Sequence, residues 1–449
     1  MQRAADQTPP TAATRGRLLR ILGVGFGLAV IIGNTIGAGI VSTPGTIAAQ
    51  LPNAWLFIGV WIVGGLYALL GAISIAELGT MIPRSGGQYV FAHDALGGYA
   101  GFIVGWSDWI STCGASSFIS LIIAQYAGVL FTALAGKTVA VAITIVVVFA
   151  IIQWRGIRWG SGVQNITSLL KALAFAVLVI SCFVLAGNRA SPASEAVQVP
   201  HGLKLFVAVI LALQGVIYTY DGWTGVIYFS EEVRNPDRDI PRSMMGGVLS
   251  VIAIYLLVNV AVLYVLPLSE IAGSDLALGK AAQVIFGSNG DRIFRTLMIL
   301  SMLSAVNACQ LMATRVLFAM SRDGLFTAKA AGANEGGTPV VALFLSTVVA
   351  ALFILTGTVD QVLAVVAFFF VVNYAISFWV LFVLRKREPE RQRPYRAWGY
   401  PWTTGASHHG SLAFLAGAVA SDTRNSVYAL LVLAASYPVF RLTKWLAVR

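Results

Sequence analysis

Charged residues are scarce in this chain. Asp, Glu, Lys and Arg make up 11% of its 449 residues and hydrophobic residues make up 57%, whereas soluble domains carry roughly 25% charged residues. Apolar runs of about 20 residues recur from one end to the other, and that length crosses the roughly 30 Å hydrocarbon core of a bilayer. The composition excludes a soluble globular protein and predicts an all-α polytopic membrane protein with twelve transmembrane helices.

Cysteine and histidine are rare as well. The three cysteines, Cys113, Cys182 and Cys309, fall inside predicted spans, so neither a disulfide framework nor a disulfide-linked partner subunit is indicated. The four histidines fall in loops or at span ends, and the sequence has no HExxH, CxxC or P-loop motif. We therefore predict no metal site, no cofactor and no enzymatic activity.

The positive charge has a topological pattern. If both termini are cytoplasmic, most loop Lys and Arg residues lie on the cytoplasmic side, including those of a retained N-terminal tail at 1–20 and a basic loop at 385–409. This is the positive-inside distribution. The net charge of +11 therefore indicates orientation and contact with the lipid bilayer, not nucleic-acid binding.

Two hydrophobic segments are interrupted near their middle by short Gly-rich polar stretches. The first runs over 21–50 with its break at 33–39, and the second runs over 205–232 with its break at 220–222. Backbone groups freed by such a break survive in a membrane only where protein or a water-filled cavity satisfies them. Two interrupted segments at corresponding places in the two halves of a chain indicate the binding site of a secondary transporter.

The positions of the breaks also predict the domain organisation. Five spans in each unit give the two units opposite membrane orientation, which makes the broken spans one and six symmetry mates. We expect a first five-helix repeat at 21–187, an inverted second repeat at 204–384, and two further helices at 410–449.

The first break carries a signal for anion binding. Gly33, Gly37 and Gly39 flank polar Asn34 and Thr35, and each glycine costs a regular helix roughly 1 kcal/mol relative to Ala. A helix that restarts near residue 38 would point its positive N-terminal end into the gap, which suits a carboxylate. The alternative interpretation is close packing of helices on small residues.

The second break carries an acid and aromatic residues. Asp221 lies deep in an apolar segment, where an ionised group is costly unless it is paired. Gly222 permits unusual dihedral angles, and Tyr218, Tyr220 and Trp223 could cover a substrate. The alternative for these aromatic residues is an interfacial belt.

Lys171 stands inside the predicted fifth span. Its ammonium group needs acceptors, either carbonyl groups freed in the first break or the carboxylate of Asp221. We consider both a proton carrier and a structural cation that locks two helices. Other polar residues within spans are expected to hold helices together rather than bind substrate, namely Asn307, Gln310, Arg315, Asn373, Asp108 and Glu77.

Three stretches resemble the amino acid–polyamine–organocation (APC) family, in its L-amino acid transporter-like branch and related bacterial permeases. They are IIGNTIGAGIVSTPG at 31–45, YTYDGWTGVIYFSEEVRNPDRDIPRSM at 218–244 and RPYRAWGYPW at 393–402. The resemblance implies a leucine-transporter-like (LeuT-like) fold of two inverted five-helix repeats. It extends over nearly the whole chain.

The resemblance also implies residue roles. The substrate carboxylate would meet amides of Gly37, Ala38 and Gly39, and its amino group would meet carbonyls near Thr35, Ile36 and Tyr218. Tyr218 would be an aromatic gate. Lys171 would occupy the place of a sodium ion in sodium-coupled relatives.

Three positions depart from the family pattern. Ala38 replaces a Ser that is common in relatives, and Asp221 stands where several have Gly. The polar segment 403–411 interrupts the expected apolar start of span eleven.

We therefore expect a sodium-independent permease for neutral L-amino acids in the bacterial inner membrane, working by alternating access as an exchanger or proton symporter. The alternatives are transport of polyamines, cationic amino acids or nucleobases, a non-transporting amino acid sensor or channel, and a membrane-embedded enzyme.

Overall fold

The computed structural model describes residues 17–186, 200–356, 359–421 and 423–447, and helices account for nearly all of the regular structure there. The helices in chain order are α1 (Val24–Thr35), α2 (Gly39–Gln50), α3 (Ala54–Met81), α4 (Gln88–Leu96), α5 (Gly98–Leu130), η2 (Thr132–Leu134), α6 (Thr138–Trp154), α7 (Ile157–Leu185), α8 (Leu203–Thr219), η4 (Gly225–Phe229), α9 (Pro236–Val265), α10 (Leu268–Ile271), α11 (Ala277–Phe286), η5 (Gly287–Asn289), α12 (Gly290–Arg322), η6 (Ala328–Ala331), α13 (Val340–Thr356), α14 (Val359–Arg387), α15 (Trp402–Ser421) and α16 (Thr423–Ala447).

Several of these helices can cross a membrane. Within the described ranges, seven helical stretches are long and apolar enough, and the bent pair of α1 and α2 would make an eighth. Three shorter apolar helices, α6, α8 and α13, fall below that length. The prediction of an all-helical, multi-pass membrane protein is confirmed, and the number of twelve spans stays a prediction.

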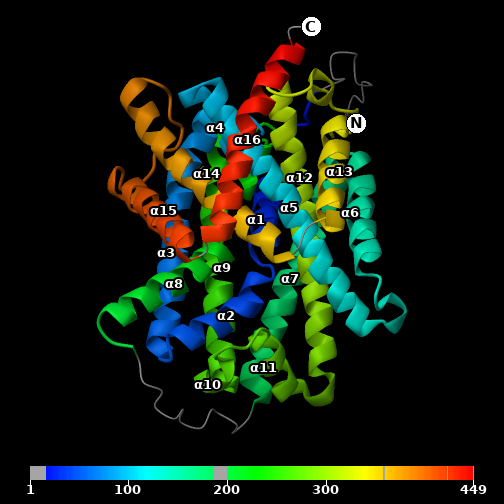
Figure 1. The fold of residues 1–449 in the computed structure, drawn as a ribbon, viewed down its shortest axis with the longest axis vertical. Coiled ribbons are helices and arrows are strands. Elements are labelled where there is room, and N and C mark those ends of the chain that lie inside the picture. The colour runs from blue at the N-terminus through cyan, green and yellow to red at the C-terminus, as the bar shows by residue number, and fades with distance from the viewer. Residues whose placement is uncertain (1–16, 187–199, 357–358, 422, 448–449) are drawn as a thin grey trace, which may run out of the picture.

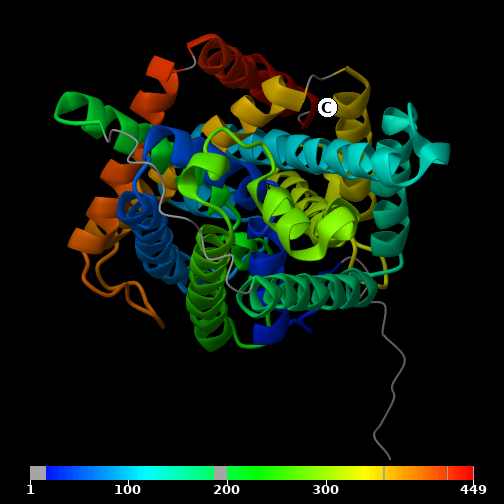
Figure 2. The ribbon, with the colours of Figure 1, turned by 90° about the horizontal axis from the view of Figure 1, so that it is seen from below.

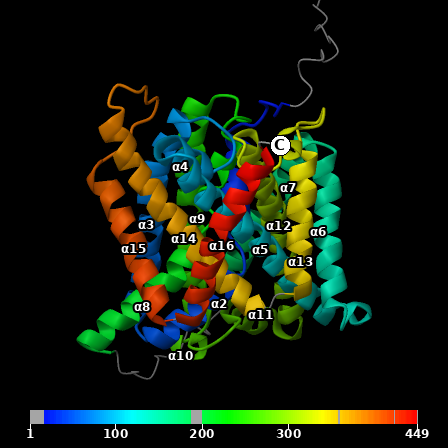
Figure 3. The same ribbon diagram turned by 45° about the horizontal axis from the view of Figure 1, so that its top comes forward.

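The long helices form one bundle around α5 and α12. Figure 1 shows α1, α5, α9 and α12 at its centre, with α15 on one side and α6 and α13 on the other. Seen from below, α5 (cyan) crosses the middle of the molecule and α15 (orange) lies at its rim (Figure 2). The described chain begins and ends at the same end of the bundle (Figures 1 and 3), which we call the terminal end.

Buried amide side chains join helices in this bundle. Asn307 of α12 accepts a hydrogen bond from Gln153 of α6 at 2.9 Å and donates one to Gln164 of α7 at 2.8 Å. Gln310 donates to a carbonyl of α6, and Asn373 of α14 accepts from Ser107 of α5. Each of these amides thus links two or more helices.

The C-terminal region differs from expectation. The basic loop predicted at 385–409 is shorter, because α14 continues to Arg387 and α15 begins at Trp402. The polar segment 403–411 does not break the helix. Thr404 bonds to Ser74 of α3, and Ser411 bonds to Tyr67 of the same helix. One polar stripe of α15 therefore faces α3. Because these polar side chains are bonded to protein, the first turns of α15 need not be apolar to form a helix in this position.

Two acids near the terminal end are paired with arginines. The fully buried Glu232 accepts two hydrogen bonds of 3.0 Å from Arg315 of α12, whose guanidinium lies 5.2 Å from the ring centroid of Phe229. Glu77 of α3 contacts Arg385 and Arg393. The chain just before α1 pairs with the chain beyond η4 through the bridge between residues 22 and 233. These contacts join chain segments that are far apart in the sequence at this end of the bundle.

The substitution Arg315→Met leaves Glu232 buried without its counter-ion. Removing one member of a buried ion pair costs about 3–5 kcal/mol, so we expect a clear fall in the thermal unfolding temperature of the purified protein. Arg295→Met is the matched control. Arg295 lies on the same helix and pairs at 2.8 Å with the partly exposed Asp291, a pair expected to contribute less than about 1 kcal/mol. Equal shifts for both variants would contradict the prediction.

Candidate functional site

The first helix break separates α1 from α2. The helix axes are bent by 48° at this break. The carbonyl groups of Gly33 and Ile36 accept no hydrogen bond from a backbone amide of α1 or α2. Lys171 of α7 donates a hydrogen bond to the Gly33 carbonyl at 2.7 Å and another to the Ile36 carbonyl. Ser304 and Ser301 of α12 donate to the same two carbonyls at 3.3 Å each. The freed acceptors are thereby satisfied by protein, as a membrane requires.

Lys171 is the end of a polar stripe on α7. Gln164 and Ser168 precede it at helical spacing, and both donate to the Ala29 carbonyl of α1, at 3.2 and 2.7 Å. The close approach depends on Gly33, because a Cβ atom there would lie 2.1 Å from the Gln164 amide nitrogen. Gly33 therefore takes part in close helix packing as well as in the break. Both interpretations of that glycine apply.

The second break follows α8 and lies directly against the first. Gly222 has a φ of +109°, and a Cβ atom there would lie 2.9 Å from the backbone nitrogen of Thr35. The hydroxyl of Tyr255, on α9, lies 2.8 Å from the Thr35 carbonyl oxygen and 2.9 Å from that of Thr219. The hydroxyls of Thr43 and Thr219 are 2.7 Å apart. One cluster of contacts thus joins the two breaks.

A cavity of about 70 Å³ opens where the breaks meet. Its wall includes the first residues of α2 and the end of α8, with further residues from α5, α12 and α14. The lining residues are Asn34, Thr35, Gly37, Ala38, Gly39, Ala115, Phe118, Ile119, Tyr218, Thr219, Asp221, Cys309, Val366 and Phe370.

One end of this cavity favours an anion. The first amides of α2 have no helical acceptor, and the helix has no acidic residue in its first turn. Gly37, Ala38 and Gly39 form that part of the wall. The dipole of α2 adds a partial positive charge there.

Asp221 supplies the acidic group of the cavity. It lines the same cavity, and one of its carboxylate oxygens accepts a hydrogen bond from the hydroxyl of Tyr374 on α14. No ion pair joins Asp221 to Lys171 in the part of the chain that the structure describes, because Lys171 is directed to the carbonyls of the first break. Two kinds of acceptor were considered for Lys171, and in the structure its ammonium group donates to carbonyls of the first break, not to Asp221.

The structure divides the residues predicted for the site into two groups. Six line the cavity: Thr35, Gly37, Ala38, Gly39, Tyr218 and Asp221. Ile36 is buried and presents only its carbonyl, to Lys171. Gly222 forms the contact between the breaks.

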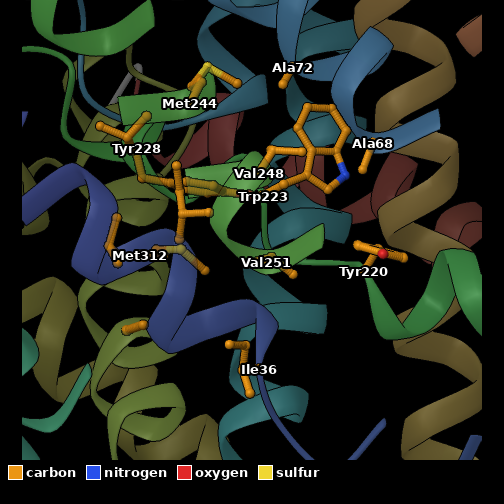
Figure 4. Close-up of a cluster of buried hydrophobic side chains, with 14 of the residues drawn as sticks. Ile36, Ala68, Ala72, Tyr220, Trp223, Tyr228, Met244, Val248, Val251 and Met312 are labelled. Carbon is orange, nitrogen blue, oxygen red and sulfur yellow. The ribbon is translucent and has the colours of Figure 1, made fainter. Parts of the chain in front are cut away.

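Tyr220 and Trp223 lie near the second break but are not among the residues that line the cavity. Figure 4 shows both among buried hydrophobic side chains. Tyr220 packs against Trp61 and Tyr255, and Trp223 packs against Tyr374 with ring centroids 4.8 Å apart. Both are buried core residues, so neither the substrate-covering role nor an interfacial belt describes them.

Sequence reasoning missed the walls formed by other helices. Ala115, Phe118 and Ile119 of α5 recur at helical spacing, and so do Val366 and Phe370 of α14. Such a stripe in an apolar span has the same pattern as ordinary packing. Asn34 had a weak signal, since it is polar within the first break, whereas Cys309 lies inside the unbroken α12 and reaches the cavity only through the fold.

Comparison with known sequences gives consistent matches. The sequence model of a family described as "Amino acid permease" matches residues 27–436. The serine/threonine exchanger SteT of Bacillus subtilis is 29% identical over 433 residues, which cover 94% of this chain and 96% of that protein. The human b(0,+)-type amino acid transporter 1 is 28% identical over 407 residues, covering 87% and 80%. The rat large neutral amino acids transporter small subunit 2 is 27% identical over 415 residues, covering 88% and 76%.

A pair of glycine substitutions tests the contact between the breaks. Gly222→Ala forces a Cβ atom against Thr35 at a positive φ, so we expect a loss of about 1–3 kcal/mol of stability. Gly37→Ala is the control, because no atom lies within 4 Å of its added Cβ. Thermal unfolding of both variants in detergent is the measurement. A Gly222→Ala protein as stable as Gly37→Ala would show that the breaks are not in the close contact described.

Proposed function

Because this chain belongs to the amino acid permease family, we propose that it is a secondary active transporter that carries L-amino acids across the membrane by alternating access. One observation carries the proposal. Two broken helices meet at a cavity that has a helix N-terminus on one side and a carboxylate on the other. That arrangement complements the two charges of an amino acid.

We propose that the substrate carboxylate binds the free amides around Gly37, Ala38 and Gly39. These amides and the dipole of α2 stabilise a negative charge. Ala38 leaves this contact to the backbone alone, since its side chain offers no hydroxyl group.

The substrate ammonium group would bind at the opposite wall. Each carbonyl oxygen has two lone pairs, and Lys171 and Ser301 already occupy those of Ile36. The Thr35 carbonyl has one hydrogen bond, from Tyr255. Of these two carbonyls, that of Thr35 therefore keeps acceptor capacity for the ammonium group, with the carboxylate of Asp221 as the charged partner. Tyr218 is proposed as the aromatic gate.

The size of the cavity favours a small substrate. A single water molecule needs about 10–15 Å³ of cavity volume. The cavity of about 70 Å³ therefore accommodates roughly five water-sized groups. A neutral amino acid with a short side chain has about that many heavy atoms. Asp221 is the observation that favours the second candidate, a cationic amino acid or polyamine.

We propose that Lys171 replaces a bound cation in the transport cycle and makes it sodium-independent. Its ammonium group already serves the carbonyls of the first break that a sodium ion would otherwise coordinate. The similarity to SteT, a serine/threonine exchanger, supports exchange over proton symport.

The membrane organisation proposed is twelve spans in a LeuT-like arrangement, with repeats at 21–187 and 204–384. Both termini would face the cytoplasm at the inner membrane of a bacterium. The described chain begins and ends at the terminal end of the bundle, which supports placing both termini on one side of the membrane (Figure 1). The ion pair of Glu232 and Arg315 would then close the cytoplasmic side, and opening that side would separate contacts there.

Counterflow in proteoliposomes tests the proposed function. Vesicles preloaded with unlabelled serine should accumulate labelled serine several-fold faster than empty vesicles, because an exchanger returns with substrate bound. A sensor or a channel gives no such acceleration. Preloading with lysine or putrescine separates the candidates: acceleration by these compounds but not by serine would favour the cationic class.

Lys171→Ala tests the proposed coupling role. Hydrogen bonds from a charged donor contribute about 1.5–3 kcal/mol each, so we expect uptake to fall roughly tenfold to a hundredfold while the protein remains in the membrane. Lys280→Ala is the control, because Lys280 lies on the surface and donates to the Glu270 carbonyl. Normal uptake by Lys171→Ala would refute the role.

A further inference from the structure

A second cavity lies on the outer side of α8, between α3, α8 and α15. Its volume is about 320 Å³, against about 70 Å³ for the cavity at the breaks. We call it the lateral groove. It is lined by Val63, Gly64, Leu66, Tyr67, Leu70, Ile210, Leu213, Gln214, Ile217, Ala406, Ser407, Gly410, Ala413 and Phe414.

The Tyr67 hydroxyl, the Gln214 side-chain nitrogen and the Ser407 hydroxyl, three polar groups of the lateral groove, each have a hydrogen-bond partner within the protein. The Tyr67 hydroxyl lies 2.7 Å from that of Ser411, the Gln214 amide donates to the Phe414 carbonyl at 3.1 Å, and Ser407 donates to its own helix. None of the lining residues is charged. Because most of the lining side chains are apolar, an apolar occupant suits the walls.

The position of the groove along α3 indicates which apolar molecule is available. At about 1.5 Å per residue, Val63 to Leu70 lie roughly 14–24 Å from the first residue of α3, Ala54. Trp55 at that start is 86% exposed, as is typical of a side chain at the membrane interface. Val63 and Leu66 at the rim are each 50% exposed. The groove thus opens at the middle of the hydrocarbon layer.

We propose that the lateral groove is a binding site for one acyl chain of a membrane lipid. The acyl chain enters from the surrounding hydrocarbon, lies along α8 and makes no polar contact with the protein. The C-terminal end of α8 borders the lateral groove on one side and the substrate cavity on the other. Leu213, Gln214 and Ile217 line the groove, and Tyr218 and Thr219 line the cavity.

The bound acyl chain would therefore support the helix end that forms the substrate cavity, an effect that rests on the proposed function. Two glycines of α3 allow α8 to approach closely at this level. A Cβ atom on Gly64 would lie 2.3 Å from Val216, and one on Gly65 would lie 3.0 Å from the Tyr220 hydroxyl. The acyl chain fills the space beside this contact, so it restricts sideways movement of α8.

Photo-crosslinking tests the site without any measurement of transport. The protein is reconstituted with phosphatidylethanolamine that carries a diazirine in the middle of one acyl chain, irradiated and digested, and adducts are mapped by mass spectrometry. We expect adducts to be at least fivefold denser on 63–70, 210–217 and 406–414 than on the exposed face of α7. Equal density on both surfaces, or an unlabelled groove in a protein that sediments as a dimer, would overturn the proposal.

Groove-filling variants make the test specific. Ala413→Trp and, on another turn of α15, Ala406→Phe place rings into the groove, and each should remove most of its adducts. Ala176→Trp, at an exposed position of α7, is the control and should leave them in place. Adducts that persist in both filled variants would refute the site.

The proposed effect of the bound acyl chain on α8 is tested by a separate measurement of transport. In counterflow, Ala413→Trp should change the maximal rate at least threefold relative to Ala176→Trp. An unchanged rate in a variant that has lost its adducts would refute the effect on α8. Failure of counterflow in the unaltered protein would instead refute the proposed function, and the adduct pattern would still decide the site.

Discussion

The site depends on one interaction, the hydrogen bonds from the Lys171 ammonium group to the carbonyls of the first break. Lys171 is 0% exposed, and a cation in that position needs acceptors as much as the freed carbonyls need donors. Each group removes the desolvation cost of the other. Because α7 supplies the donor, the break in one helix is held by a neighbour far away in the sequence, and α2 can direct its N-terminal amides into the cavity.

The second break depends on the first in turn. Gly222 lies against the backbone at Thr35, and the hydroxyl of Tyr255 serves one carbonyl from each break. The cavity is therefore formed where two irregular segments satisfy each other, with α5 and α14 closing its sides. On its far side, α8 is bordered by the lateral groove. A single helix end thus separates the cavity that holds Asp221 from a groove with no charged residue.

The sequence located both breaks and the buried lysine, because glycine clusters and a charge inside apolar runs have few structural explanations in a membrane. It could not orient individual side chains within a break. Tyr220 and Trp223 adjoin Asp221 in sequence, yet they pack into the core, since the backbone turns between them. The contributions of Phe118 and Phe370 depend on tertiary packing, and the polar stripe of α15 became interpretable only with α3 beside it.

The close contact at Gly222 has a consequence for how selectivity could diverge. With no room for even a methyl group at Gly222, the backbone contact between the two breaks has almost no freedom to vary. The walls from α5 and α14 come from helices outside the breaks and include Ala115 and Val366. Descendants of this chain that handle different side chains would therefore differ there, while the junction of the breaks would remain the same in all of them.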